Sequence, residues 1–490
     1  LKRAINFVDI NKYSKTYGFA DRLFWSWRIK DFNNGSFQGL IYAFSEIKHN
    51  ESFNNLYLKY NKNNELDLAL DACIEGAFKS LSQGASQEAF PNEKSFCVTS
   101  TLLYDLIYCL DKCGKIDDLT PQEILILEKS SKYISKYIEN HANIGNHLAS
   151  ALCALYIFRD KLGNQNKEVN NGIEAIVKRL NSIWSEEGWF EEYGASDIGY
   201  LTLSLQYLTR IDDIEFKEKE IWNQKIINFL IHFFHTDGSI GNYYGSRGSS
   251  VIYPAGLIKS GYVEINNDII ESLKKNKIPA PQDLDDTNFV PCLNSFVQSY
   301  IELNQDCTKN IKLPKNQDKY LKIFKKAGFL IISNQNEQII IDLKNAGSIS
   351  IFSKDNVTRE GSPLIVHKKR KTIYRVLNSE YKIEQNDDVN ITIRGSFYKT
   401  NTGSIGIKET LLSRLFLPGI SYFPNLFNFI KFLIAKKYFI PSKKKCFFEK
   451  KITISNYKVN SEIDIQIPKD FTFVRSQKEH PIRMASQNYM

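Results

Sequence analysis

The hydrophobic pattern of the chain changes near Leu313, and this change restricts the folds that the chain can adopt. From residue 22 to about residue 310, apolar residues recur every three or four positions, as in "LDLALDACIEGAFKSL", which is the period of amphipathic helices. Beyond Leu313 come short runs of β-branched and aromatic residues, such as "FLIISN", "QIIIDL" and "VNITIRGSFY", which are typical of strands. A run of helices followed by a run of strands predicts two segregated domains.

The length of the chain agrees with this division. With 490 residues, the chain is too long for one ordinary hydrophobic core. We therefore predict a domain of successive helical hairpins over residues 1–312 and an antiparallel β-sheet domain over residues 313–490.

The two predicted domains differ in charge. Residues 313–490 contain 31 Lys and Arg against 15 Asp and Glu, whereas residues 1–312 contain 33 against 40. The basic half favours an anionic partner, although solubility alone explains such a charge equally well. Its lysines are dispersed without a recognisable reading module, so nucleic acid is not the predicted partner.

The cysteines and the apolar segments bear on the compartment. Eight cysteines are scattered without metal-finger spacing, which predicts buried free thiols and favours a reducing compartment such as the cytoplasm. No membrane span is predicted, because Pro418, Pro424 and Lys431 interrupt the most apolar late stretch. The chain opens with "LKRAINFVDI", which lacks a signal-like apolar core and leaves open whether a targeting peptide was ever present.

The segment "NIGNHLASALCALYIF" is the first candidate for a functional site. Its bulky residues, from Leu148 to Tyr156, form one helical stripe, and Asn146 and His147 lie off that stripe beside a face of small residues. Such a face lets another helix or a ligand approach closely. The alternative is that Asn146 caps the helix and that His147 is a packing histidine.

The segment "GWFEEYGASDIGY" places unusually many aromatic and acidic residues at a helix entrance. Gly194 suits the turn, and Ser196 or Asp197 is well placed to cap the following helix. Tyr200 stands in the first turn of that helix, off the leucine stripe that begins at Leu201. Capping explains Asp197, but it leaves Trp189, Tyr193 and Tyr200 unexplained.

A third segment, "FHTDGSIGNYYGSRGSSVIYPAGL", predicts a long irregular loop between two helices. The large aromatic and charged side chains of Tyr243, Tyr244 and Arg247 are not expected on a loop without a function. Aromatic rings stack on sugars, and an arginine side chain grips a carboxylate through two parallel hydrogen bonds. A nucleotide-binding loop is a poor alternative, because no strand precedes these glycines.

These motifs, in this order along a helical array that precedes a β domain, resemble the heparinase II/III-like family of polysaccharide lyases. The resemblance implies an incomplete α/α toroid followed by an antiparallel β-sandwich. It implies β-elimination at a uronic acid within an acidic polysaccharide or oligosaccharide of glycosaminoglycan-like type. It also implies a periplasmic or secreted protein, against the cysteine argument, so the compartment stays open.

The same resemblance assigns roles to residues. In that family, the enzyme must neutralise the uronate carboxylate, remove the C5 proton and protonate the leaving 4-oxygen. The family pattern gives Asn146 as the carboxylate partner, His147 as partner or base, and Tyr200 as base, acid or both. To these catalytic residues we add Arg247 as a further carboxylate clamp, on chemical grounds. The predicted substrate-binding residues are Trp189, Glu192, Tyr193, Asp197 and Tyr244.

The β domain departs from the family pattern. Related lyases commonly carry a histidine, and sometimes a metal cluster, early in this domain, whereas "IIIDLKNAGSISIFSKDN" contains no histidine. The only histidines there are His367 and His480, so we predict no metal site and no cofactor. Two alternatives therefore stay open, a non-catalytic glycan-binding protein and a glycoside hydrolase that draws a carboxylate pair from Glu191, Glu192 and Asp197.

Overall fold

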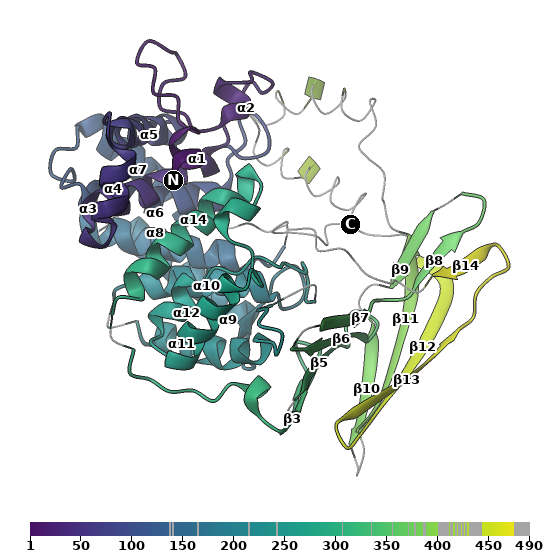
Figure 1. The fold of residues 1–490 in the computed structure, drawn as a ribbon. Helices are drawn as coiled ribbons and strands as arrows, with labels where there is room; N and C mark the ends of the chain where they lie inside the picture. The colour runs from purple at the N-terminus through teal and green to yellow at the C-terminus, as the bar shows by residue number, and fades with distance from the viewer. Residues whose placement is uncertain are drawn as a thin grey trace.

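The computed structural model shows a helical domain followed by two antiparallel sheets, as predicted (Figure 1). It describes residues 1–136, 139, 142–163, 166–213, 216–241, 244–305, 307–334, 336–354, 356–370, 372–376, 379–385, 389–399 and 443–474, with scattered residues between 411 and 430. Tyr243, His480 and most of the apolar stretch 415–440 lie outside the described residues. None of the described helices is long and apolar enough to cross a membrane. All eight cysteines are free, as predicted, but only five are buried, because Cys97, Cys113 and Cys307 are partly exposed.

The longer helices form two layers. In the inner layer, each helix packs against the next around a ring that a contact between its last and first members closes. The inner helices are α3 (Leu40–His49), α6 (Phe96–Lys112), α8 (Gly145–Leu162), α10 (Ile198–Arg210), α12 (Ala255–Lys259) and α14 (Asp286–Glu302). The outer helices are α5 (Glu65–Leu81), α7 (Pro121–Lys136), α9 (Lys167–Ile183), α11 (Lys217–Leu230) and α13 (Val263–Lys274). This alternation of inner and outer helices is the predicted α/α toroid.

Shorter elements complete the helical domain. The segments α1, α2 and α4 flank the N-terminal side, and short 3-10 turns and a two-stranded sheet lie between the longer helices. Their bounds are α1 (Lys2–Ile5), α2 (Arg22–Trp25), η1 (Gly35–Gly39), η2 (Glu51–Phe53), α4 (Asn54–Tyr60), β1 (Trp184–Ser185), β2 (Trp189–Phe190), η3 (Ile231–Phe233), η4 (Pro281–Asp283) and η5 (Pro314–Asn316).

The remaining strands form two antiparallel sheets. The five-stranded sheet has the order β3-β4-β5-β6-β7, and the second sheet has the order β13-β12-β11-β9-β8-β14, with β10 paired to β11. The bounds of the first are β3 (Lys319–Phe324), β4 (Phe329–Asn334), β5 (Glu337–Asp342), β6 (Ser348–Ser353) and β7 (Asn356–Glu360). The bounds of the second are β8 (Leu364–His367), β9 (Ile373–Val376), β10 (Glu380–Gln385), β11 (Val389–Lys399), β12 (Lys443–Ser455), β13 (Lys458–Ile465) and β14 (Phe471–Val474).

The five-stranded sheet lies between the helices and the second sheet (Figure 1). Along β4, Phe329 and Ile331 belong to the core of the helical domain, whereas Leu330 and Ile332 belong to the core between the sheets. Both faces of this sheet are therefore buried. That explains why "FLIISN" is almost continuously apolar instead of alternating with polar residues.

Polar contacts also join the sheet to the helical domain. His235 stacks on Phe352 of β6 with 3.7 Å between ring centroids. Its Nδ1 lies 2.6 Å from Oε1 of Gln338 on β5. Asp342, at the end of β5, accepts a hydrogen bond of 3.1 Å from the backbone N–H of Gly245. The sheet thus holds the loop that precedes Arg247.

Candidate active site

A cavity of about 360 Å³ lies inside the ring of inner helices. Its walls come from the helical domain, mainly from η1 and from the inner faces of α6, α8, α10 and α14. Cys97, Asn146, Tyr200 and Thr287 line it, and each stands in the first turn of one of these helices. Helix N-termini carry partial positive charge, and the carboxylates of Glu88, Glu93 and Glu139 line the cavity near them.

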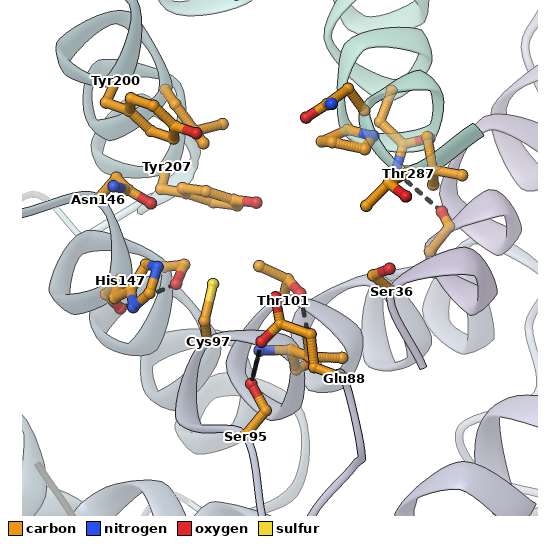
Figure 2. Close-up of a pocket in the computed structure, with 18 of the residues that line it drawn as sticks. Ser36, Glu88, Ser95, Cys97, Thr101, Asn146, His147, Tyr200, Tyr207 and Thr287 are labelled. Atoms are coloured by element: carbon orange, nitrogen blue, oxygen red, sulfur yellow. Dashed lines mark hydrogen bonds between the residues drawn. The ribbon is translucent and has the colours of Figure 1, made fainter. Parts of the chain in front are cut away.

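The four residues predicted to be catalytic all line this cavity. They are Asn146, His147, Tyr200 and Arg247. Figure 2 shows Tyr200 on one side of an open centre, with Asn146 and His147 below it and Thr287 opposite. Helices α8 and α10 and the loop before α12 supply the four residues, so residues more than 100 positions apart in the sequence meet here.

A short pairing of two turns brings the start of α8 to the start of α10. Ile144, just before α8, forms a β-bridge with Glu192, and the N–H of Gly145 donates to the carbonyl of Glu191. A side chain at position 145 would meet Phe190 at 2.6 Å, so this approach requires glycine. Helix α8 begins at Gly145 with Ile144 as its N-cap, and the alternative that Asn146 caps the helix is wrong.

Asn146 and Arg247 converge on Glu192. The amide nitrogen of Asn146 donates to both carboxylate oxygens of Glu192 at 2.9 Å. Nη1 of Arg247 lies 3.3 Å from Oε1 of the same carboxylate, and the side chains of Arg247 and Glu192 are 10% and 4% exposed. Burial raises the pKa of Glu192, an effect that Arg247, His147 and Asn146 oppose. Glu192 therefore stands behind the cavity wall and holds two of the lining residues in place.

The Arg247 guanidinium lies over the rings of two tyrosines. Its Cζ is 3.9 Å from the ring centroid of Tyr200 and 5.0 Å from that of Tyr193. A cation over an aromatic face is held by the ring quadrupole. The guanidinium thus fixes Tyr200 at the wall and brings a positive charge next to its phenol.

Asp197 connects Tyr200 and Arg247 through their backbones. It is the N-cap of α10, as predicted, because its Oδ1 accepts from the N–H of Tyr200 at 3.0 Å. Its Oδ2 accepts from the N–H of Arg247, also at 3.0 Å. The same carboxylate therefore sets the position of two lining residues that are 47 positions apart.

Replacing Asp197 by alanine is expected to lower the free energy of unfolding by about 2–4 kcal/mol, since a helix cap is lost and a second buried N–H is left unpaired. Urea unfolding monitored by circular dichroism measures this change. Asn166→Ala is the matched control, because Asn166 caps only its own helix, α9, and is expected to cost about 1 kcal/mol. Equal losses in the two variants would contradict the double role of Asp197.

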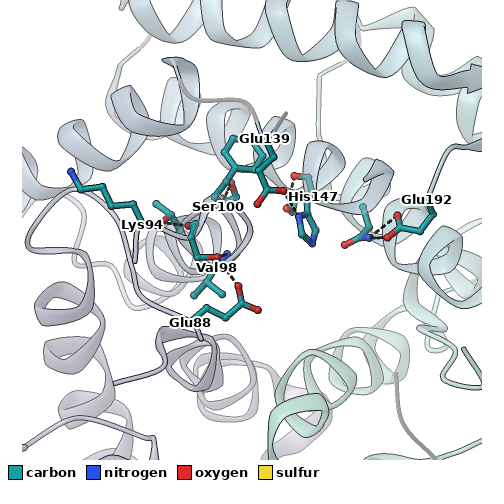
Figure 3. Close-up of polar contacts among 12 residues, drawn as sticks. Glu88, Lys94, Val98, Ser100, Glu139, His147 and Glu192 are labelled. Atoms are coloured by element: carbon teal, nitrogen blue, oxygen red, sulfur yellow. Dashed lines mark hydrogen bonds and ion pairs between the residues drawn. The ribbon is translucent and has the colours of Figure 1, made fainter. Parts of the chain in front are cut away.

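His147 lies in a charged environment. Its Nδ1 is 2.6 Å from Oε2 of Glu139, and Figure 3 shows this contact beside the start of α8. Burial alone lowers the pKa of His147, but Cys97 and Glu139 together raise it well above its ordinary value. A raised pKa favours the protonated imidazole, which suits a partner of an anion better than a base.

The raised pKa of His147 makes the stability of the protein depend on pH. Because the folded state holds this proton more tightly than the unfolded chain, the stabilisation is full below a pH of about 6.5 and is lost as the pH rises through the folded-state pKa. We expect thermal unfolding to show this alkaline loss in the wild type and not in His147→Gln. Cys97, Glu139 and Glu88 also face this region.

A Cys97→Ser variant provides the control for the pH dependence. The pKa of Cys97 is raised by burial, so its thiol also titrates at alkaline pH. Because Cys97 also contributes to the raised pKa of His147, the two variants are compared: if the alkaline loss of stability persists in His147→Gln and disappears in Cys97→Ser, the titrating group is the thiol and the assignment to His147 is wrong.

Tyr193 lines the cavity in an uncommon backbone conformation. Its φ is 53°, in the left-handed region that costs a residue with a bulky side chain about 1–3 kcal/mol. The hydrogen bond from the N–H of Tyr193 to the carbonyl of Asn143 and the pairing of Glu192 with Ala195 hold it there. Gly194 follows with a φ of 91° and supplies the turn, as predicted.

Four of the predicted substrate-binding residues do not line the cavity. Trp189 and Tyr244 are core residues with 7% and 3% exposure, and Tyr244 packs on Phe233 and Phe329 at the interface with the sheet. Glu192 and Asp197 are buried and occupied by the contacts described above. Tertiary contacts cover these four side chains, so they do not face the cavity. Their predicted role in sugar binding is therefore replaced by packing and positioning. Tyr193 does line the cavity.

Several lining residues have no counterpart among the predicted ones. Glu88 and Lys94 come from the segment before α6, Glu139 from the segment before α8, and Asp105 and Arg210 from further along α6 and α10. Glu88 and Glu139 lie in irregular stretches without a motif. Arg210 is the last residue of α10, whose other residues are mostly apolar. This charge at the end of an apolar pattern is the one signal in the sequence that pointed to any of these lining residues.

No group of three or more His, Cys, Asp or Glu side chains among the described residues is placed to hold a metal ion.

Among known proteins, only solved structures are similar to this chain. No family model and no curated protein matches the sequence. The chain is similar to heparinase III, with 11% identity and a TM-score of 0.43 over 84% of this chain and 61% of that chain. It is also similar to the Streptomyces coelicolor chondroitin AC lyase, with 10% identity, a TM-score of 0.45 and coverage of 82% and 66%.

A third similar structure is a mutant of the heparan sulfate lyase HepC from Pedobacter heparinus, with 8% identity, a TM-score of 0.38 and coverage of 98% and 82%. The chain spans less than two thirds of the length of the heparinase III and chondroitin AC lyase chains. The sequence motifs resemble those of the heparinase II/III-like polysaccharide lyases, and these solved structures are likewise named as polysaccharide lyases or heparinases.

Proposed function

We propose that the protein is a polysaccharide lyase that cleaves an acidic, uronate-containing polymer by β-elimination. The observation that carries this proposal is the meeting of a phenol, a guanidinium, an amide and an imidazole on one cavity wall. They belong to Tyr200, Arg247, Asn146 and His147. This set combines groups that bind a carboxylate with a group that moves a proton.

In the proposed reaction, the uronate carboxylate lies against His147 at the start of α8, and Asn146, whose amide nitrogen donates to both carboxylate oxygens of Glu192, supports the wall behind it. The positive imidazole and the partial charge of the helix N-terminus stabilise the negative charge that builds up as the C5 proton leaves. A single well-placed donor of this kind contributes about 10²–10³ in kcat. Glu139 keeps His147 protonated and oriented.

Tyr200 is the proposed proton-transfer group. The neighbouring Arg247 guanidinium favours the ionised phenol, which takes the C5 proton. The C4–C5 double bond forms, the bond from C4 to the leaving oxygen breaks, and the proton passes from Tyr200 to that oxygen. Glu192 occupies one edge of the Arg247 guanidinium. We therefore propose that the main role of Arg247 is to activate Tyr200, and that binding of the substrate is secondary.

The charge of the β-sheet domain supports a long anionic substrate. Residues 313–490 carry an excess of basic residues over acidic ones, and the sheets formed by the described residues of this range lie beside the helical domain that contains the cavity (Figure 1). A polymer held partly by this basic region gains affinity outside the site of cleavage.

The proposal is tested by incubation of the purified protein with a panel of uronate-containing polymers, among them heparan sulfate, chondroitin, hyaluronan, alginate and polygalacturonate. Elimination creates an unsaturated sugar end, which absorbs in the ultraviolet. A rise in absorbance on at least one polymer is the expected result. Absence of a rise on all of them would count against elimination.

Hydrolysis is the second candidate, because Glu88 lines the cavity as a potential proton donor. Burial and the neighbouring Glu93 raise the pKa of Glu88, as in the general acid of a glycosidase. The carboxylate pair first considered, drawn from Glu191, Glu192 and Asp197, does not line the cavity. A product with a new reducing end and no unsaturation would favour hydrolysis.

A further inference from the structure

Cys97 is a cavity residue that the proposed elimination does not use. It stands in the first turn of α6 and is partly exposed. Figure 2 shows its sulfur directed at the open centre of the cavity, beside His147. Among the described residues that line the cavity, Cys97 is the one thiol, so its surroundings decide whether it can act as a nucleophile.

Cys97, His147 and Glu139 form a row of interacting side chains, which we call the thiol triad. Nδ1 of His147 lies 2.6 Å from Oε2 of Glu139, so Nε2 is the ring nitrogen left for a second partner. That partner is the thiol of Cys97, which shares a hydrogen bond with the ring. The side chains of His147 and Glu139 are each 18% exposed. A thiol, a base and a carboxylate that orients the base form the arrangement of enzymes with a nucleophilic cysteine.

The start of α6 fixes the position of the thiol. Ser95 is the N-cap, and its Oγ accepts from the N–H of Val98 at 3.3 Å. The first helical hydrogen bond runs from the N–H of Thr99 to the carbonyl of Ser95. The N–H of Cys97 precedes these bonds, so it can donate to an oxygen that develops negative charge beside the sulfur. The positive end of the helix also favours the thiolate.

Charges around the triad set the pH at which the thiol reacts. Burial raises the pKa of Cys97, while the charge of His147 and the hydrogen bond to its ring oppose this rise. The carboxylates of Glu88 and Glu139 raise it further. The other charged residues that line this part of the cavity are Glu93 and Lys94. The reactivity of the thiol is therefore expected to increase toward alkaline pH, as the pair of Cys97 and His147 loses its first proton.

We propose that Cys97 is the nucleophile of a second activity, the hydrolysis of a carboxylic ester carried by a ligand in the cavity. The thiolate attacks the carbonyl carbon, a C–S bond forms, the ester C–O bond breaks, and His147 gives its proton to the leaving alkoxide. Water that His147 deprotonates then attacks the thioester. This step releases the carboxylic acid and restores the thiolate and the protonated ring. Glu139 is the positioning residue that orients His147.

A carbohydrate can carry such an ester in two forms, as an acyl group on a hydroxyl or as an alkyl ester of a uronate. Both present the same carbonyl carbon to Cys97. The activity depends on the thiol triad and has no step in common with the proton transfer at Tyr200. It therefore goes beyond the proposed elimination and does not rest on it.

The wild-type protein is tested first with p-nitrophenyl acetate at mildly alkaline pH. We expect continuous release of p-nitrophenol and, in quenched samples, an acetyl group on Cys97 that peptide mass spectrometry locates. This probe contains no uronate and cannot undergo elimination, so the result is independent of the lyase assay. Acetylated and methyl-esterified polygalacturonate then distinguish the two kinds of ester, because the first releases acetate and the second releases methanol.

Two variants of Cys97 test the nucleophile. Cys97→Ala and Cys97→Ser are each expected to lower the rate of ester hydrolysis by at least about 10². The serine variant keeps the size of the side chain, so its melting temperature is expected to stay close to that of the wild type. Hydrolysis at the wild-type rate in either variant, or a stable acetyl adduct on Cys97 without turnover, would overturn the proposal.

Cys113→Ala is the matched control. Cys113 is also partly exposed, stands just after α6 and lies outside the cavity. A hydrogen bond with Cys109 lowers its pKa, so it reports the reactivity of a thiol without a triad. Its replacement is expected to leave ester hydrolysis within a factor of about two. The proposal is wrong if the acetyl group is found on Cys113 and not on Cys97.

Glu139→Gln tests the positioning role through the pH profile of hydrolysis. The charge of Glu139 raises the pKa of both Cys97 and His147, so its loss is expected to move the rise in rate to lower pH. A purely structural role would lower the rate equally at every pH. An unchanged profile would exclude Glu139 from the triad.

Discussion

Replacement of Tyr200 by phenylalanine is expected to lower kcat by about 10²–10⁴, the usual contribution of a positioned proton-transfer group. The ring that packs under the Arg247 guanidinium, 3.9 Å from its Cζ, is retained, and only the hydroxyl is lost. KM is therefore expected to change little, since Tyr200 contributes to the transition state more than to binding of the ground state. Absorbance of the unsaturated product on the best polymer gives both constants.

Tyr262→Phe is the matched control for Tyr200. Tyr262 stands at the start of α13, where its hydroxyl exchanges hydrogen bonds with Gln224, and it does not line the cavity. Its replacement is expected to leave kcat within a factor of about two, because it alters only a surface contact. Unchanged activity in Tyr200→Phe would exclude Tyr200 as the proton-transfer group even if elimination itself is observed.

The second large effect concerns the buried pair of Glu192 and Arg247. Replacement of Glu192 by alanine is expected to destabilise the protein by about 3–5 kcal/mol, because it leaves the charge of Arg247 buried without its partner. It also removes the acceptor of the Asn146 amide. Urea unfolding measures the loss, and activity is expected to fall with it, because two wall residues lose their support.

A double variant separates stability from function at this pair. Glu192→Leu combined with Arg247→Met replaces both charges by apolar groups, which is often neutral for a buried pair. We expect the double variant to be more stable than Glu192→Ala and still to lack activity, since the cation next to Tyr200 is gone. An active double variant would show that the guanidinium is not needed for proton transfer.

An exposed pair supplies the reference for this experiment. Lys79 and Glu75 pair across one turn of α5 with side-chain exposures of 37% and 54%. Glu75→Ala is expected to change the free energy of unfolding by less than about 1 kcal/mol, because solvent screens such a pair. If Glu192→Ala lowers the free energy of unfolding by an equally small amount, burial does not strengthen the pair of Glu192 and Arg247 at the cavity wall.

The division into a helical and a sheet domain was predictable because it depends on local periodicity. The apolar spacing in "LDLALDACIEGAFKSL" is repeated on the buried face of α5, and "FLIISN" coincides with β4. The predicted runs omit strands β3, β7, β8, β10 and β14. At most one residue in each of these strands is buried, so no strong apolar pattern marks them in the sequence.

The candidate wall residues were predicted to be functional because packing of the helices did not account for them. Asn146, His147 and Tyr200 stood off the apolar stripes of their helices, and the cavity is on that other face. The same reasoning failed for Trp189 and Tyr244, because an aromatic residue outside a helical stripe can still be covered by another part of the chain. Here β2 packs into the helical core, and the five-stranded sheet covers Tyr244.

The sequence by itself determined the helices and most of the strands, the cap at Asp197 and the turn at Gly194, since these depend on residues within a few positions of one another. Only the tertiary structure decided that the inner helices form a ring with several N-termini at one end. It also decided that Glu192 meets Asn146 and Arg247, which are 46 and 55 positions away, and that Glu139 lies against His147. Burial and the field of distant charges set these properties, and neither is encoded in a local pattern.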